Sequence, residues 1–234
     1  MKKVIQQQNL STQIVEYVKD LLLAGELSPG DKITELSIAN ALSISQPPVR
    51  EAMQILMAEG FVETKGKRGR YITKMSPQQI MNSYFTGGII EGGVVAHSLP
   101  KFTEEVMRTL DGMILKMKKH ADGLLDIDDF AQLDMEFHNY LFSISGNMTA
   151  RDITFRCCQT IGKYYFYPKW KEMYTAIEKF ERHNIIVKAI RSQDKQLVQK
   201  TLLEHYTSAS EIISRHVEQD EIDFDEKKLV NSLG

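Results

Sequence analysis

Apolar residues in the first third of the chain recur every three or four positions, which is the spacing of one face of an α-helix. The pattern predicts helices over 11–24, 34–42 and 46–59. Gly25 and Gly60 follow the first and third helices, and glycine readily adopts the left-handed backbone that ends a helix. Because only Ser43-Ile44-Ser45 separates the second helix from the third, we expect a helix-turn-helix.

A basic hairpin is predicted after the three helices. Residues 65–74 contain two glycines, the apolar pair Tyr71-Ile72 and no acidic residue. The cations of this stretch are Lys65, Lys67, Arg68, Arg70 and Lys74. A turn followed by a strand fits the pattern, and two short helices with a basic hairpin suit insertion of one helix into a DNA major groove. On charge alone, a solvated turn is the alternative.

The remainder of the chain is predicted to be helical. Ser76-Pro77 has the chemistry of a helix start. Six helical patterns follow, at 77–98, 102–120, 127–145, 149–166, 170–191 and 194–217. We therefore predict a mainly α protein with a winged helix-turn-helix over 1–75 and an antiparallel helical bundle over 76–218. Residues 219–234 are acidic and weakly periodic, which predicts a loose tail.

Charge is distributed unevenly along the 234 residues. The whole chain has 29 Lys plus Arg against 31 Asp plus Glu, a net charge of -2. Residues 1–75 hold 10 cations and 8 acids, a balance of +2, and residues 76–234 hold 19 and 23, a balance of -4. This pattern excludes a protein that coats nucleic acid along its whole length, but it allows a domain that reads DNA.

Other features indicate a cytoplasmic protein with no membrane partner. No apolar run approaches the roughly 18 residues of a spanning helix, and the first ten residues lack the apolar core of a signal peptide. The two cysteines, Cys157 and Cys158, are adjacent, which argues against a disulfide framework and fits a reducing compartment.

Four residues of the predicted bundle could bind a metal. Asp134 and His138 are four positions apart and so share one helix face. His183 precedes the turn near Gln193 by ten residues and His205 follows it by twelve, so an antiparallel hairpin places both roughly 15–18 Å from the turn. Three imidazoles and a carboxylate suit zinc, nickel, manganese or iron. The alternative is a surface Asp–His pair and two structural histidines.

The run GELSPGDKITELSIANALSISQPPVREAMQILMAEGFVETKGKRGRYI resembles the DNA-binding domain of GntR-family transcription regulators. The resemblance covers about residues 10–75. In that family the third helix reads bases and the wing contacts the minor groove or the backbone. The resemblance implies DNA contacts by Ser45, Gln46, Arg50, Lys67, Arg68 and Gly69.

Gln46 departs from the family, which usually has arginine there. Arginine pairs bidentately with guanine, whereas glutamine pairs with adenine, so we expect a shifted operator preference. Two alternatives stay open: Gln46 contacts phosphate alone, or Arg50 forms a salt bridge with Glu51 or Glu35.

The segments DMEFHNYLFSISGN and ERHNIIVKAIRSQD, with the last helix, resemble the FCD domain of the FadR subfamily. That domain has six or seven helices, and in many members an Asp and three His hold a divalent metal that faces a cavity and often helps to bind a small carboxylate. The resemblance implies that the metal ligands are Asp134, His138, His183 and His205, with zinc as the favoured ion.

The effector site departs from the family pattern. The family commonly has an arginine four residues before the glutamate that matches Glu91, but this chain has Gly87 there. Arg151 or Arg156 could replace that arginine, and an aromatic stretch that includes Tyr164 could line the pocket or belong to the core. Gly87, Gly88, Gly92 and Gly93 share one predicted helix, where each costs about 1 kcal/mol; they could widen the pocket or allow close helix packing.

The leading hypothesis is a metabolite-responsive regulator that binds a palindromic operator as a homodimer, with no enzymatic activity. Two alternatives remain. The metal itself could be the signal, or the site could be a metalloenzyme centre. For the enzyme, a general base is missing beside the ligands, because Glu136 lies on another face of the helix that carries Asp134.

Overall fold

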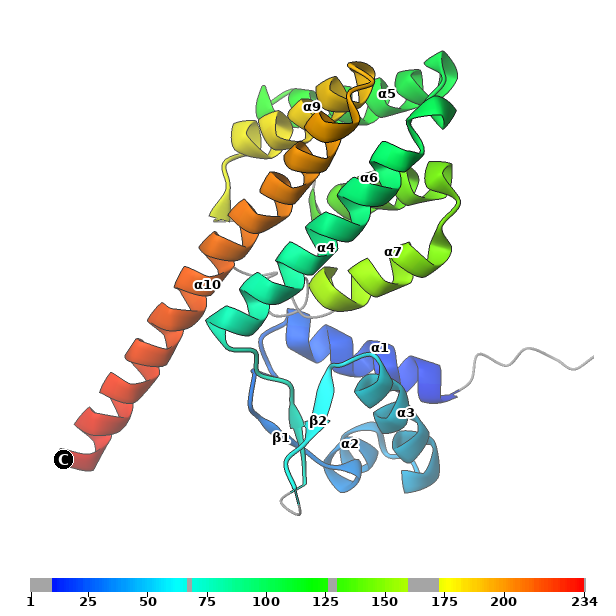
Figure 1. The fold of residues 1–234 in the computed structure, drawn as a ribbon. Coiled ribbons are helices and arrows are strands. Elements are labelled where there is room, and N and C mark those ends of the chain that lie inside the picture. The colour runs from blue at the N-terminus through cyan, green and yellow to red at the C-terminus, as the bar shows by residue number, and fades with distance from the viewer. Residues whose placement is uncertain (1–9, 67–68, 126–129, 160–172, 234) are drawn as a thin grey trace, which may run out of the picture. The chain divides into compact units, whose positions relative to one another are not determined.

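The computed structural model describes residues 10–66, 69–125, 130–159 and 173–233 (Figure 1). The chain divides into two compact units, with the first ending at Lys74 and the second beginning at Met75. Within the described ranges, no helix is both long and apolar enough to cross a membrane. Each unit has its own apolar core and is described separately below.

Three helices form the first unit, close to the predicted ranges. They are α1 (Leu10–Leu23), α2 (Glu35–Leu42) and α3 (Gln46–Ala58). Thr34 caps α2 through reciprocal hydrogen bonds with Ser37, and Ser43 ends that helix in the left-handed conformation. Val18, Val49 and Leu56 are fully buried between α1 and α3. The predicted helix-turn-helix is confirmed.

A small antiparallel sheet completes the first unit. Its strands are β1 (Lys32–Ile33), β2 (Val62–Thr64) and β3 (Arg70–Ile72), in the order β1-β3-β2. Gly66 and Gly69 have positive φ angles in the hairpin between β2 and β3, where glycine has no Cβ to clash. This hairpin is the predicted wing. The sequence pattern missed β1 because two residues are too short to show alternation.

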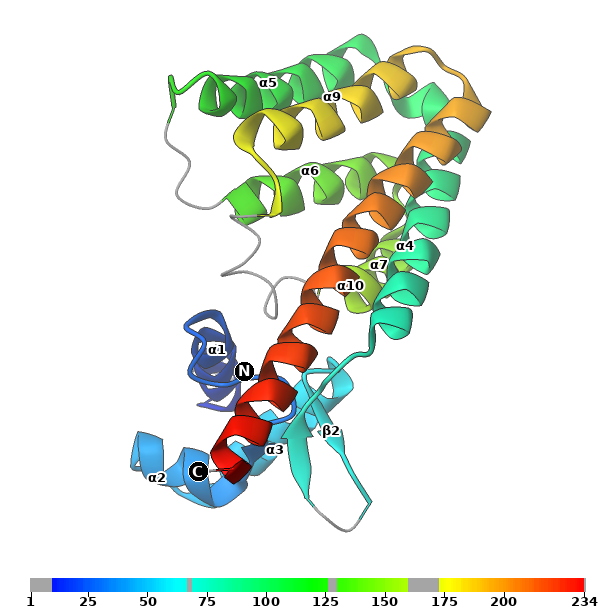
Figure 2. The same ribbon diagram turned by 90° about the vertical axis from the view of Figure 1, so that its left-hand side faces the viewer.

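Long helices make up the second unit (Figures 1 and 2). Among the described residues, the α-helices are α4 (Pro77–His97), α5 (Glu104–Ala121), α6 (Phe130–Ser145), α7 (Met148–Thr154), α9 (Ala176–Arg191) and α10 (Lys195–Leu233). A 3-10 turn, η1 (Leu99–Lys101), follows α4, and a π-helical stretch, η2 (Phe155–Gln159), follows α7. In both views α4 runs beside α10 and α5 beside α9, in agreement with their contacts. The fold is therefore mainly α, as predicted.

The glycines of α4 allow close packing against neighbouring elements. A Cβ at Gly88 would lie 3.1 Å from the Cα of Leu203, and one at Gly92 would lie 3.1 Å from the carbonyl oxygen of Gln199. A Cβ at Gly87 would collide with the sulfur of Cys158, whereas one at Gly93 would meet nothing within 4 Å. Close packing against α10 therefore explains Gly88 and Gly92 better than a widened pocket does.

Two predicted ranges in the second unit need correction. α9 begins at Ala176 rather than at residue 170, because Thr175 forms a capping box with Glu178 that fixes the helix start. The loose tail predicted for 219–234 is wrong as far as residue 233, since α10 continues through Leu233. That helix contains no proline or glycine, and residues such as Glu, Lys and Leu propagate a helix without a regular apolar stripe.

Candidate metal centre and DNA-reading helix

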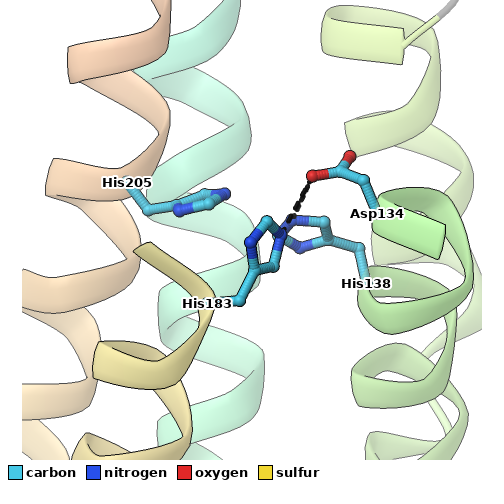
Figure 3. A group of neighbouring side chains, drawn as sticks. All are labelled: Asp134, His138, His183 and His205. Atoms are coloured by element: carbon cyan, nitrogen blue, oxygen red, sulfur yellow. Dashed lines mark hydrogen bonds and ion pairs between the residues drawn. The ribbon is translucent and has the colours of Figure 1, made fainter. Parts of the chain in front are cut away.

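The four predicted metal ligands converge in the second unit. Asp134 and His138 project from one face of α6, His183 comes from α9 and His205 comes from α10 (Figure 3). Each offers a ligand-capable nitrogen or oxygen atom, and these four atoms lie within 4.8 Å of one another. His183 and His205 lie at similar distances from the turn near Gln193, as predicted, and their ring centroids are 5.1 Å apart.

His183 is oriented by the backbone of its own helix. Its Nδ1 atom donates to the carbonyl oxygen of Lys179 at 2.7 Å, and its Nε2 atom lies 3.0 Å from Oδ1 of Asp134. The backbone hydrogen bond thus leaves Nε2 as the atom available to a metal.

His138 is oriented by a buried carboxylate. Its Nδ1 atom lies 2.9 Å from both oxygens of Glu91, a residue with 0 % exposure that also accepts a 2.5 Å hydrogen bond from the hydroxyl of Tyr206. Burial lowers the pKa of His138, but the charge and hydrogen bond of Glu91 and the charge of Asp134 raise it to about 9. Nε2 of His138 therefore faces Asp134, 3.9 Å from Oδ1.

His205 presents a neutral ring to the other ligands. Its buried Nδ1 atom has no hydrogen-bond partner among the described residues. Burial, together with the positive charges of His183, Arg182 and His138, lowers the pKa of His205 well below its usual value. A buried imidazole without a proton partner is the form that coordinates metals.

The donor set fits a divalent metal ion. Burial disfavours the Asp134 carboxylate, but the hydrogen bond from His183 and the charges of His138 and His183 outweigh that effect and lower its pKa. Zinc takes nitrogen and oxygen ligands at about 2.0–2.2 Å, so ligands on opposite sides of an ion lie about 4 Å apart. Ligand atoms within 4.8 Å need only small movements to reach that spacing.

A cavity of about 70 Å³ adjoins the four ligands. Besides them, the lining includes Tyr84, Phe130, Cys158, Tyr174, Lys179, Arg182, Tyr206 and Ala209. The buried Lys179 ammonium lies 5.2 Å from the ring centre of Phe130, and the Arg182 guanidinium lies 4.4 Å from that of Tyr174. The cavity is thus lined by both charged and aromatic side chains.

The described residues that were expected to bind an effector do not line this cavity. Arg151 donates to Asn139 and Asp152, the exposed Arg156 donates to the carbonyl oxygen of Asp152, and neither lines the cavity. Glu91 supports His138 from behind and is also absent from the lining. Tyr164 lies outside the described residues.

Sequence reasoning missed two cations at this cavity. Lys179 and Arg182 lie four residues and one residue before His183, so all three project from one side of α9. That spacing could have indicated a basic side of the cavity, but it also suits an exposed basic helix face. The enzyme alternative gains no support from Glu136, whose exposed side chain accepts a hydrogen bond from Gln132.

The predicted reading helix presents an exposed polar end. Ser45, Gln46 and Arg50 are exposed at the start of α3. Arg50 is 62 % exposed and pairs with Glu35 at 3.1 Å, which is one of the two alternatives for that arginine. Glu35 also accepts from Arg70 at 2.5 Å. Exposed ion pairs contribute about 0–1 kcal/mol, so a DNA phosphate or base can displace Arg50 from Glu35.

The wing is described in part. Gly69 lies in the hairpin, and its carbonyl oxygen accepts a 3.2 Å hydrogen bond from the amide of Lys65. Lys67 and Arg68 lie outside the described residues.

Comparison with known families decides the identity. Residues 10–72 match the family described as bacterial regulatory proteins, gntR family, and residues 84–208 match the FCD domain. The chain belongs to the GntR family and carries an FCD domain. This GntR-family chain is therefore a DNA-binding transcription regulator, and the resemblance inferred from the sequence is confirmed.

Curated relatives agree with this assignment. The HTH-type transcriptional repressor RspR of Escherichia coli K12 is 25% identical over 217 residues, which cover 93% of this chain and 94% of the repressor. The Nta operon transcriptional regulator of Aminobacter aminovorans is 27% identical over 119 residues, or 51% of this chain and 56% of that protein.

Solved structures share the fold. E. coli McbR/YncC superposes with a TM-score of 0.65 at 19% identity, covering 88% of this chain and 98% of that one. Lar, described as controlling the expression of the Listeria monocytogenes agr system, gives a TM-score of 0.61 at 17% identity over 92% and 99% of the two chains.

Proposed function

We propose that the protein is a homodimeric regulator of the FadR subfamily whose helical unit holds a divalent metal, with zinc favoured. A small effector, a carboxylate, binds beside this metal and changes the affinity for a palindromic operator. The observation that carries the proposal is the convergence of Asp134, His138, His183 and His205 in a chain that also has a winged helix-turn-helix.

The metal would be held by Nε2 of His138, Nε2 of His183, His205 and the carboxylate of Asp134. These groups come from α6, α9 and α10, so the ion would link three helices. When bound, it supplies a positive centre that orients an anionic ligand. Four protein ligands leave coordination positions for that ligand on an ion that accepts five or six.

Operator binding is assigned to α3 and the wing. Ser45, Gln46 and Arg50 would contact the major groove, and Lys67, Arg68 and Gly69 would contact the minor groove or the backbone. One reading helix covers a short half-site, so two copies related by a two-fold axis would match a palindrome. The amide of Gln46 suits adenine better than guanine.

The link between effector and operator is assigned to α4. This helix follows the wing strand β3 after four residues and carries Glu91, whose carboxylate holds His138. A ligand changes operator affinity if it binds one arrangement of the helical unit more tightly than another. Changes around His138 would reach the start of α4 through the helix itself.

The test is operator affinity in defined metal and ligand states. Selection from random DNA supplies the operator, and fluorescence anisotropy then measures the affinities of the metal-free protein, the zinc-loaded protein and the zinc-loaded protein with carboxylates. The proposal predicts that a carboxylate changes the affinity of the zinc-loaded form. If zinc alone switches DNA binding and no organic ligand alters it, the metal is the signal and the effector proposal is wrong.

A further inference from the structure

Arg182 is a largely buried cation in the cavity beside the proposed metal centre. Its Nη1 atom donates to the hydroxyl of Ser208 at 2.8 Å, and its Nη2 atom donates to the carbonyl oxygen of His205 at 2.7 Å. The guanidinium plane also packs over the ring of Tyr174. All three partners are uncharged, and within the described ranges no carboxylate forms an ion pair with Arg182.

These contacts fix the guanidinium. The carboxylates of Asp134 and Glu178 act on its charge from a distance, without an ion pair to it among the described residues. A guanidinium has five N–H donors in a rigid fork that matches the two oxygens of a carboxylate. Burial of an unpaired charge is unfavourable, which makes such a group a strong binder of an anion that reaches it. Arg182 and the four metal ligands line the same cavity, so one small anion can reach both.

The charges around the cavity indicate the charge of a ligand that would neutralise the site. With a divalent ion in place and neutral histidines, the ion and Arg182 contribute three positive charges. Asp134 and the Glu91 carboxylate behind His138 contribute two negative charges. One negative charge is missing, even before Lys179 in the cavity lining is counted. A monoanion between the metal and Arg182 would balance the centre.

The size of the cavity restricts the ligand. A cavity needs about 10–15 Å³ of space to hold one water molecule, so about 70 Å³ suits a small group of a few heavy atoms. The aromatic rings of Tyr84 and Tyr174 also line this space. A short carboxylate fits this space.

We propose that Arg182 is the anion-binding residue of this regulator, and that it binds one end of a short monocarboxylate whose other contact is the metal. Arg182 on α9 thereby takes the place of the arginine that is missing at Gly87 on α4. This inference rests on the proposed metal-dependent function, and it deepens that function by naming the residue and the ligand class.

The experiment measures acetate and glycolate binding to the zinc-loaded full-length protein by calorimetry, with acetamide as a neutral ligand of similar shape. Arg182→Gln removes the charge, and Arg182→Lys keeps the charge but loses the fork. Arg151→Gln is the matched control, because Arg151 lies outside the cavity. Zinc content and operator binding are measured separately on every variant.

We expect acetate or glycolate to bind the wild type more tightly than acetamide does, and about tenfold or more weaker binding to Arg182→Gln at unchanged zinc content. Arg182→Lys should fall between the two, and Arg151→Gln should match the wild type. Equal carboxylate affinity in Arg182→Gln would overturn the inference. The inference would also be overturned if the wild type binds zinc and operator but binds neither carboxylate more tightly than acetamide. A wild type that binds no zinc would instead overturn the proposed function itself. If Arg182→Gln loses zinc, the carboxylate affinity of Arg182→Lys is compared with that of the wild type. Weaker binding by Arg182→Lys would support the inference, and equal binding would overturn it.

Discussion

Nδ1 of His138 lies 2.9 Å from both carboxylate oxygens of Glu91, and Glu91 is fully buried. The bond joins α6 to α4 and fixes which ring nitrogen of His138 faces the metal centre. Residues that orient a metal ligand in this way also raise its basicity, and their loss typically costs 10–100-fold in metal affinity. We therefore propose that Glu91 positions His138 for the metal and does not contact the effector.

The first prediction follows from this contact. Glu91→Gln keeps the size of the side chain but removes the charge, so we expect zinc to bind about 10–100-fold more weakly. Competition with a chromophoric chelator measures the change. Glu136→Gln is the control, because Glu136 lies on α6, the helix that carries His138, and its side chain is exposed. Equal zinc affinity in Glu91→Gln and the wild type would remove the positioning role.

Metal affinity should depend on pH through His138. The raised pKa of about 9 means that the metal-free ring keeps its second proton up to that pH. A metal must displace this proton, so affinity should rise about tenfold per pH unit between 6.5 and 9 and level off above 9. Chelator competition across that range tests the slope. A flat profile below pH 9 would show that His138 does not bind the ion.

Removal of one ligand should affect metal content and stability together. We expect His183→Ala to lose bound metal and to unfold at the same temperature with or without added zinc, because a ligand that binds the folded state stabilises it. Thermal unfolding and elemental analysis measure both quantities. His97→Ala, at an exposed position on α4, should retain the response to zinc. Full metal retention in His183→Ala would refute this site.

Arg50 should contribute to operator binding despite its ion pair with Glu35. Arg50→Ala should weaken binding by about 1–3 kcal/mol if the guanidinium reads a base. Glu35→Gln frees Arg50 from the pair, so its operator affinity should equal or exceed that of the wild type. Arg191→Ala removes an exposed cation of the second unit and serves as the control. Unchanged affinity in Arg50→Ala would leave the Glu35 salt bridge as the role of that arginine.

The side chain at position 46 should set one base of the operator. We expect Gln46→Arg to change the preference from adenine to guanine at a single position in each half-site. Selection from random DNA with both proteins compares the two sequences directly. A preference that stays the same would indicate that Gln46 contacts phosphate alone.

Local sequence signals predicted much of the fold, and together with the family resemblance they predicted a candidate metal site. The helical spacing located α2 and α3 because turn residues flank both helices. The spacing of Asp134, His138, His183 and His205 could be interpreted from helix geometry. The partner of Glu91 could not be predicted in this way. Its contact with His138 spans 47 residues and depends on how α4 packs against α6, which no local pattern encodes. Arg182 was missed because its spacing from His183 also suits an exposed basic helix face, and its hydrogen-bond partners come from α10.

Native mass spectrometry of the purified protein tests the central claim most directly, because it measures oligomeric state and bound metal together. The account predicts a dimer that carries one divalent ion per chain after exposure to zinc, and a dimer of His183→Ala that carries none. A wild-type protein that remains monomeric or binds no ion under these conditions would contradict it.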